Sequence, residues 1–251
     1  MPPTDADTDS TPCPGEGVED TLDLRLPDEL LTLFGRDQPA GAASSSSPRS
    51  LTAPRDGGPA GDDLLDTLAD WSAATTPVGS FQLVPVRIER DLGRIARWMN
   101  DPAVAAFWEL SGPESVTAAH LRTQLDGDGR SIPCLGVLDG TPMSYFEIYR
   151  ADLDPLARHY PARPHDTGIH LLIGGVADRG RGLGTVLMRA VADLVLDNRP
   201  RSARVVAEPD LRNTPSVSAF LSAGFRFSAE VDLPDKRAAL MVRDRALRSL
   251  L

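Results

Sequence analysis

The pattern of apolar and polar positions changes near residue 75. From there to the C-terminus, short runs rich in β-branched and aromatic residues alternate with segments whose apolar residues recur every three or four positions. The resulting order is strand, helices, hairpin, strand, helix, strand, helix and hairpin. We therefore expect residues 76–251 to form one mixed α/β sandwich domain.

Turn and capping residues set the expected boundaries. Strands are predicted at 81–86, 134–138, 143–149, 168–174, 204–207, 225–227 and 238–242. Helices are predicted at 91–99, 104–110, 117–125, 184–197 and 215–222. Asp91 is expected to cap the first helix, Asp139-Gly140 to form a hairpin turn, and Gly224 to end the last helix in a left-handed conformation.

Residues 1–75 have a different composition. Asp, Thr, Pro, Gly and Ser dominate there, and such a segment buries too little apolar surface to offset its chain entropy. Two apolar islands interrupt it, at 22–34 and 64–71. We expect an acidic, largely disordered segment that carries short docking elements.

Charge and cysteine content narrow the function. Residues 1–75 hold 15 acidic and 4 basic residues, whereas the remainder holds 21 acidic and 22 basic residues. A near-neutral domain gives no indication of nucleic-acid binding. No run of 18 apolar residues predicts membrane insertion, and the acidic start lacks the apolar segment of a secretory signal. Cys13 and Cys134 are too few for a disulfide framework or a structural zinc site, so we expect a cytoplasmic protein without a metal.

A glycine-rich turn between a strand and a helix carries the main chemical signal. Its glycines are Gly174, Gly175, Gly180, Gly182 and Gly184. Glycine lets the backbone approach a ligand, and the free N–H groups of a first helical turn attract an anion. Together with Arg179 and Arg181, this turn predicts a pyrophosphate cradle.

Two common phosphate loops do not fit this turn. A Walker loop requires Gly-Lys-Ser/Thr, and the lysine is absent. The glycine spacing also misses the dinucleotide-binding fingerprint, and no ribose-binding acid is clearly placed. The pattern Arg179-x-x-Gly182-x-Gly184 instead resembles the acyl-CoA loop of the GNAT acetyltransferase superfamily.

Five blocks resemble one branch of that superfamily, the siderophore-biosynthesis N-acyltransferases of the aerobactin and mycobactin type. The blocks lie at 98–102, 106–109, 142–149, 166–174 and 208–213. The resemblance implies a GNAT-like fold, with a mostly antiparallel twisted sheet that is splayed at its fourth strand and flanked by helices. It also implies acetyl-CoA or another acyl-CoA as cosubstrate and the hydroxylamine of a hydroxylated lysine, ornithine or diamine as acceptor. Other siderophore-assembly enzymes are the expected partners.

The resemblance carries over to individual residues. His170 and Asp210 match the family's catalytic pair. The positions that correspond to the acyl-CoA site are Leu172, Ile173, Gly174, Arg179, Gly180, Arg181, Gly182, Gly184, Thr185, Asn213 and Ser216.

His170 and Asp210 suit direct transfer within a ternary complex. Adjacent strand ends lie ~5 Å apart, so the two side chains can converge. The substrate nitrogen would attack the thioester carbonyl while N–H groups near Leu172 or Ile173 hold the oxyanion. His170, with an ordinary pKa of ~6.5, would take the nitrogen's proton, and Asp210 would orient His170 or pass a proton to the thiolate. A core histidine and a turn-forming aspartate are the structural alternatives.

A candidate acceptor pocket follows from period two along one strand. Tyr145, Glu147 and Tyr149 share a face, on which Glu147 would hold a substrate cation. Trp108 would pack against the alkyl stem. A solvated outer face is the alternative for these residues.

Two other functions stay open. The same fold would serve for acylation of another amine, such as an aminoglycoside or a protein N-terminus, and a strongly acidic cleft would favour the polycation. A non-catalytic CoA-binding module is the other possibility, and it would bind acetyl-CoA without turning it over.

Overall fold

An eight-stranded sheet forms the centre of the part of the chain that the computed structural model describes, Leu65 and residues 68–250. Its strands are β1 Ala74–Thr76, β2 Gly79–Pro85, β3 Ser131–Leu138, β4 Thr141–Arg150, β5 Thr167–Ile173, β6 Arg204–Ala207, β7 Arg226–Asp232 and β8 Arg237–Asp244. Their spatial order is β1-β2-β3-β4-β5-β6-β8-β7, and every neighbouring pair is antiparallel except β5 and β6.

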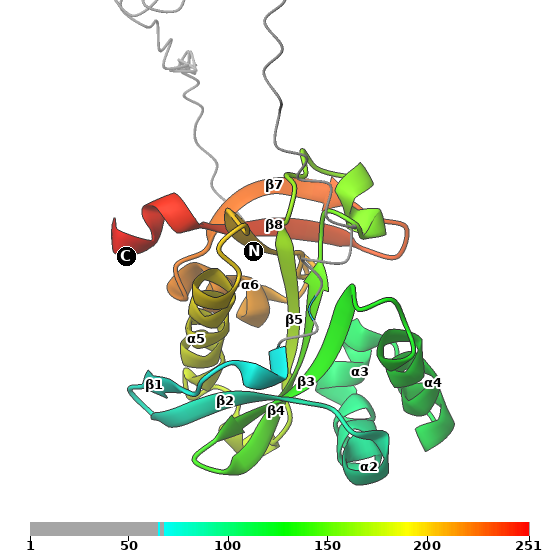
Figure 1. The fold of residues 1–251 in the computed structure, drawn as a ribbon. Helices are drawn as coiled ribbons and strands as arrows, with labels where there is room; N and C mark the ends of the chain where they lie inside the picture. The colour runs from blue at the N-terminus through cyan, green and yellow to red at the C-terminus, as the bar shows by residue number, and fades with distance from the viewer. Residues whose placement is uncertain (1–64, 66–67, 251) are drawn as a thin grey trace, which may run out of the picture. The chain divides into compact units, whose positions relative to one another are not determined.

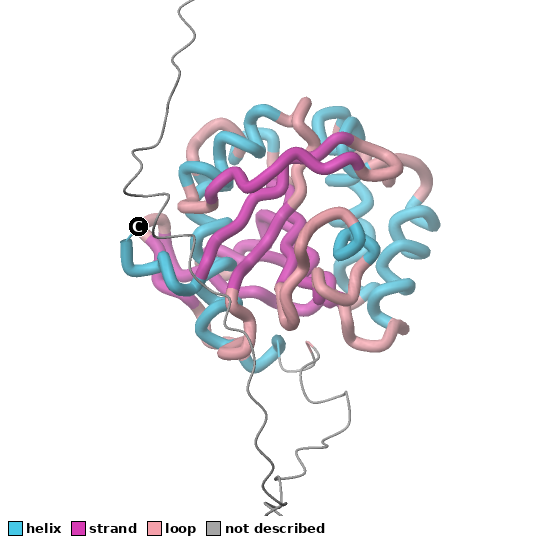
Figure 2. Tube along the Cα trace, turned by 90° about the horizontal axis from the view of Figure 1, so that it is seen from above, coloured by secondary structure: helices cyan, strands magenta, loops and turns pink. Residues whose placement is uncertain are grey.

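Helices cover both faces of this sheet (Figures 1 and 2). The α-helices are α2 Ile88–Met99, α3 Pro102–Trp108, α4 Glu114–Leu125, α5 Leu183–Asn198 and α6 Thr214–Ser222. Short 3₁₀ helices are η1 Leu68–Asp70, η2 Pro155–Arg158, η3 Val176–Asp178 and η4 Arg245–Leu250. Figure 1 shows α5 and α6 on one side of the sheet and α2, α3 and α4 on the other. The expected mixed α/β fold is therefore confirmed.

The sheet opens between β5 and β6, as expected for the fourth predicted strand. These parallel strands pair only at Thr167 with Val205 and at Gly168 with Val206, so the rest of β5 has no partner on that side. Gly174 donates its N–H to the carbonyl of Met143 on β4, at 2.8 Å. Since N–H directions alternate along a strand, the N–H groups of Leu171 and Ile173 point toward the opening.

Helix α2 begins three residues before the predicted start. Asp91 lies within the first turn instead of at the cap, and it is buried. Its Oδ2 accepts the N–H of Arg87 at 2.9 Å, and Arg90 forms an ion pair with the same carboxylate. An acidic side chain that reaches back to the cap satisfies an unpaired helical N–H from inside the helix. The prediction of Asp91 as cap was therefore wrong, although the side chain still serves the helix start.

Part of the apolar island at 64–71 belongs to the core of this domain. Leu65, Leu68 and Trp71 are buried in the same cluster as residues of the sheet and of α5. Strand β1 was not predicted, because three residues are too short for a visible period. The island at 22–34 and Cys13 lie outside the described residues.

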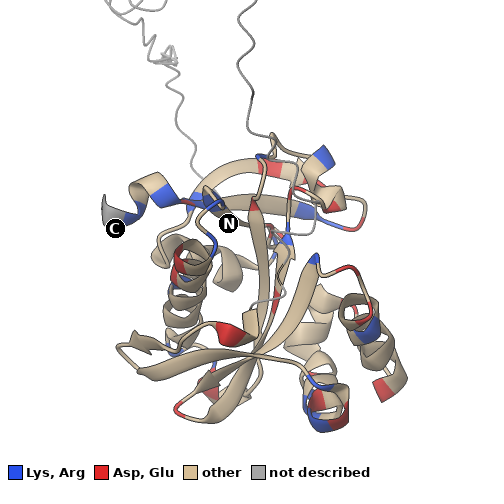
Figure 3. Cartoon of the chain, viewed as in Figure 1, with Lys and Arg blue, Asp and Glu red and all other residues tan. Residues whose placement is uncertain are grey.

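Charged residues of both signs occur along the helices, strands and turns (Figure 3). Within residues 68–250 and Leu65, no helix combines the length and apolar character needed to cross a membrane.

Candidate active site

The turn from β5 to α5 has the backbone conformation of an anion-binding loop. Gly180 and Gly182 have φ angles of +70° and +76°, and a Cβ at either position would meet nothing within 4 Å. Gly182 is the N-cap of α5, and no side chain caps the first turn. The unpaired N–H groups at this helix start are therefore available to a diphosphate.

Gly174 serves a different purpose from the one expected. A Cβ at this position would lie 2.0 Å from Cε2 of Trp98 on α2, so the missing side chain makes room for the indole ring. Packing of α2, not approach of a ligand, thus explains this glycine.

The two arginines of the loop differ in their surroundings. Arg179 directs its guanidinium back toward the protein, where it bonds the Ile173 carbonyl at 2.9 Å, the Gly174 carbonyl at 3.0 Å and Asp101 at 2.8 Å. It thereby ties the end of β5 to the start of α3. Arg181 is exposed and is not among the residues that line the adjacent cavity. The backbone amides of the loop are therefore the groups that remain available to a diphosphate, and Arg179 stabilises the loop through its bonds to the protein.

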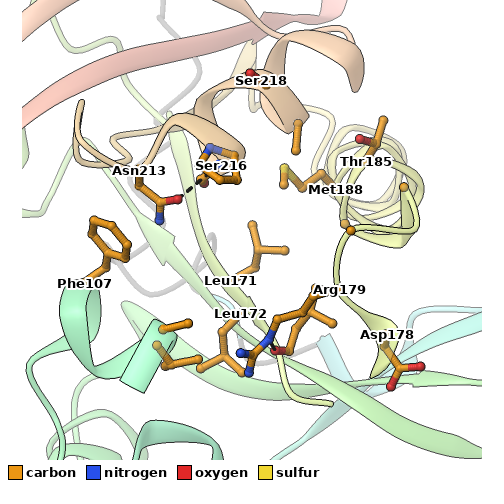
Figure 4. Close-up of a pocket in the computed structure, with 18 of the residues that line it drawn as sticks. Phe107, Leu171, Leu172, Asp178, Arg179, Thr185, Met188, Asn213, Ser216 and Ser218 are labelled. Atoms are coloured by element: carbon orange, nitrogen blue, oxygen red, sulfur yellow. Dashed lines mark hydrogen bonds between the residues drawn. The ribbon is translucent and has the colours of Figure 1, made fainter. Parts of the chain in front are cut away.

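A cavity of about 850 Å³ begins at this loop and follows the opening between β5 and α6 (Figure 4). Its lining includes most of the predicted acyl-CoA positions: Leu172, Ile173, Arg179, Gly180, Gly182, Gly184, Thr185, Asn213 and Ser216. Asn213 caps α6 by accepting the N–H of Ser216 at 3.2 Å. The volume and the open loop fit an elongated molecule with a diphosphate at one end.

A second cavity, of about 350 Å³, meets the first one. Residues that line both are Phe107, Trp108, Leu171, Asn213 and Ser216. The second cavity alone is lined by His170, Glu147, Glu208, Asp210 and Lys236, among others. A group bound in the first cavity can thus meet a group bound in the second beside the open N–H of Leu171.

His170 lies where β5 and β6 separate. Its Nδ1 contacts Glu147 Oε2 at 2.9 Å, and its Nε2 forms a short contact with Glu208 Oε1. The ring of Tyr149 lies beside it, with centroids 4.7 Å apart, and Trp108 presents an edge at 6.1 Å. The side chain remains 35% exposed, so His170 forms part of a cavity wall.

The protonation of His170 follows from these contacts. Burial disfavours the imidazolium, but the charge of Glu208 and hydrogen bonds to both carboxylates outweigh it and raise the pKa of His170 to about 10. Burial likewise opposes ionisation of Glu208, yet the charges of His170 and Lys236 lower its pKa to about 2. The two carboxylates thus favour the imidazolium form of His170 at neutral pH, in contrast to the ordinary pKa expected from sequence.

Glu147 has no free oxygen for a substrate cation. Its Oε1 accepts from His120 Nε2 at 2.5 Å, Gln124 Nε2 at 2.7 Å and the Tyr145 hydroxyl at 2.9 Å, while Oε2 faces His170. Burial opposes its charge, but the bonds from His120 and His170 hold the pKa of Glu147 well below its usual range. The face shared by Tyr145, Glu147 and Tyr149 is buried, so the solvated alternative was wrong.

Tyr149 is held between a glycine and an acid. A Cβ on Gly168 would lie 2.0 Å from the Tyr149 ring, so Gly168 is what admits the ring beside His170. The Tyr149 hydroxyl donates to Glu208 Oε2 at 2.7 Å. Trp108 packs edge-on against Tyr145, at 5.6 Å between centroids, and lines both cavities.

Asp210 lines the second cavity but does not orient His170. Its carboxylate accepts from the Arg212 N–H at 2.7 Å and from the Arg212 guanidinium at 2.6 Å. These bonds from Arg212 hold the pKa of Asp210 below its usual range. The orienting contacts that the sequence suggested for Asp210 are made by Glu147 and Glu208.

The splayed sheet, the glycine loop and the two meeting cavities define a GNAT-type fold with an acyl-CoA site. A profile of the acetyltransferase (GNAT) domain matches residues 87–233. The chain belongs to the GNAT acetyltransferase family.

Curated relatives match over about three fifths of the chain. An N(6)-hydroxylysine O-acetyltransferase of Escherichia coli is 40% identical over 155 residues, which are 62% of this chain and 49% of the relative. The lysine N-acyltransferase MbtK of Mycolicibacterium paratuberculosis is 38% identical over 154 residues, 61% of this chain and 69% of the relative. This chain thus matches about half of the length of the first relative and two thirds of the second.

Solved structures share the fold. An uncharacterized protein of Bacillus halodurans superimposes with a TM-score of 0.66 and 33% identity, covering 71% of this chain and 92% of the other. The aminoglycoside acetyltransferase AAC(6')-Ib in complex with coenzyme A gives a TM-score of 0.61 and 26% identity, covering 68% of this chain and 98% of the other. Both the resemblance seen in sequence and acyl-CoA as cosubstrate are supported by these matches.

Proposed function

We propose that this chain is an N-acyltransferase that moves an acyl group, acetyl in the first instance, from acyl-CoA to the side-chain hydroxylamine of a hydroxylated lysine, ornithine or diamine. The product is a hydroxamate, the iron-binding group of hydroxamate siderophores. The observation that carries the proposal is the junction of the two cavities beside His170. The names of the relatives, which include a hydroxylysine acetyltransferase and a hydroxyornithine transacylase, support this class of acceptor.

The reaction is a direct transfer. The hydroxylamine nitrogen attacks the thioester carbonyl, and the N–H of Leu171 donates to the developing oxyanion. The C–N bond forms, the C–S bond breaks, and the nitrogen's proton must leave while the sulfur gains one. A hydroxylamine is far less basic than an alkylamine and is neutral at pH 7, so no ammonium has to be deprotonated first.

His170 and Asp210 carry the two proton transfers. His170 gives the departing sulfur the proton that its Nε2 shares with Glu208, and ionised Asp210, which lines the same cavity, accepts the proton of the attacking nitrogen. After each turnover Asp210 releases its proton to solvent and His170 takes one up from solvent, so both groups return to their starting states. This assignment reverses the base role that an ordinary histidine pKa suggests.

The proposed setting is the cytoplasm, where acyl-CoA is available. An N-hydroxylating enzyme would supply the acceptor, and siderophore-assembly enzymes would consume the hydroxamate.

A thiol-release assay with acetyl-CoA tests the acceptor class. The panel pairs each hydroxylated amine, derived from lysine, ornithine or cadaverine, with its unhydroxylated parent, and adds kanamycin because of the likeness to an aminoglycoside acetyltransferase. We expect turnover with at least one hydroxylated amine and much slower release with its parent. Turnover of kanamycin or of parent amines alone would refute the proposal, and acetyl-CoA binding without any turnover would indicate a binding module.

A further inference from the structure

The contacts of His170 require more protons than a neutral imidazole holds. A carboxylate offers only acceptor oxygens, and a neutral imidazole has one N–H. Both ring nitrogens of His170 nevertheless lie at hydrogen-bond distance from a carboxylate, Glu147 on one side and Glu208 on the other. Each contact needs a proton between the two atoms, so the arrangement holds two.

Neither carboxylate is free to turn away from the ring. The other oxygen of Glu208 accepts from the Tyr149 hydroxyl at 2.7 Å. The other oxygen of Glu147 accepts from His120, Gln124 and Tyr145, all within 2.9 Å. Gln124 is itself fixed, because its Oε1 accepts from Ser131 at 2.7 Å. The two acids thus face His170 in a preset geometry.

An imidazolium at His170 offsets the negative charge of the two acids that contact the ring. The titratable or charged groups that face it, directly or through its two acids, are Glu147, Tyr145 and Tyr149 from β4, His120 from α4, Glu208 after β6, Lys236 from the β7–β8 turn and Asp154 before η2. Lys236 lies 3.7 Å from Glu208. Glu147 and Glu208 are two buried acids near one lysine, and an imidazolium offsets their excess negative charge.

We propose that Glu147 and Glu208 are a pair of positioning residues that clamp His170 as an imidazolium at the junction of the two cavities. Given the proposed function, on which this consequence rests, His170 gives the departing sulfur the proton that its Nε2 shares with Glu208. It also engages Glu147 and Glu208, so an incoming ammonium would meet a cation beside two carboxylates that are already paired. The clamp therefore favours a neutral nucleophile, which a hydroxylamine is and a lysine side chain is not.

Ring-nitrogen NMR on histidine-labelled full-length protein tests the clamp without any substrate. His170→Gln identifies the signal among the four histidines. In the unmodified protein we expect both ring nitrogens of His170 to stay protonated from pH 5.5 to 8.5. In Glu208→Gln and in Glu147→Gln the ring should titrate inside this range. Asp235→Asn removes an acid from the same cavity that has no described contact with His170, and it should leave the signal unchanged.

Three results would overturn the clamp. They are a His170 ring that titrates near pH 6.5 in the unmodified protein, a ring that does not respond to either glutamine variant, and an equal response to Asp235→Asn. Since Glu147 is deeply buried, Glu208→Gln provides the second variant if Glu147→Gln does not fold. The readout is separate from the acceptor panel, so a protein that acylates a different amine fails the panel and can still pass this test.

Kinetics supply a second readout. Glu208→Gln should lower kcat roughly 10- to 100-fold and leave the Kd for acetyl-CoA within about twofold, because the clamp lies outside the first cavity. A variant that lost acetyl-CoA binding and kcat together would show a general structural role for Glu208 and contradict the proposal.

Discussion

Gly182 should contribute to acyl-CoA binding because a side chain at this position would occupy ligand space. A second glycine with the same φ angle serves as the control for backbone strain. Gly182 begins α5 with φ +76°, and Gly140, in the β3–β4 turn, has φ +77°. A Cβ would meet nothing within 4 Å at either position. Gly182→Ala and Gly140→Ala therefore impose the same left-handed conformation, which costs ~1–2 kcal/mol for a residue with a Cβ. We expect both variants to lose about 2–8 °C in Tm.

Only Gly182→Ala should weaken the binding of coenzyme A. Its methyl group would project into the space of the diphosphate and displace it from the amides of the first turn of α5. Loss of one hydrogen bond to a charged group costs ~1.5–3 kcal/mol, which is roughly a 10- to 150-fold rise in Kd. Calorimetric titration with CoA measures this. Equal Kd values for the two variants, at similar losses of Tm, would refute the anion cradle.

Three further predictions concern the site and its support. His170→Gln should lower kcat about 10²- to 10⁴-fold in the thiol-release assay while calorimetry gives an unchanged Kd for acetyl-CoA, and undiminished turnover would remove His170 from the reaction. Gly174→Ala places a Cβ against the Trp98 ring and should cost ~1–3 kcal/mol of unfolding free energy in urea; no loss would contradict the packing argument. The pKa of His170 is raised from its ordinary 6.5 to about 10, so its contribution to stability is complete below pH 6.5 and disappears as the pH rises toward 10. Across this range the Tm of the unmodified protein should fall more than that of His170→Gln, and parallel curves would argue against the raised pKa.

Most of the fold follows from the chain's periodicity. The hairpin at Asp139-Gly140 and the left-handed Gly224 are present as predicted, with φ angles of +46°, +77° and +89°. These features depend on neighbouring residues, which a sequence displays directly. The start of α2 was missed because Asp91 acts on a residue four positions earlier, a contact that resembles a simple cap in the sequence.

The location of the site could also be predicted from the sequence, but the contacts among its side chains could not. The strand register that pairs Glu147 with His170 depends on how β4 and β5 align, and Glu208 reaches His170 because β5 and β6 diverge only beyond Gly168. Glu208 could have been proposed as a site residue from the sequence, because it is an acid at a strand end, two residues before Asp210. His120 had only its helical spacing to Gln124 as an indication. Arg179 fits the motif of a phosphate-binding residue, yet its three bonds to the protein become apparent only in three dimensions.

Identification of the product tests the central claim most directly. Incubation with acetyl-CoA and N(6)-hydroxylysine, followed by mass spectrometry and addition of iron(III), distinguishes an N-acyl hydroxamate, which forms a coloured iron complex, from an O-acyl ester, which does not. We predict one acetyl group per CoA released and a product that binds iron. An acetylated product that does not bind iron, or acetylation restricted to unhydroxylated lysine, would contradict attack by the hydroxylamine nitrogen at the junction beside His170.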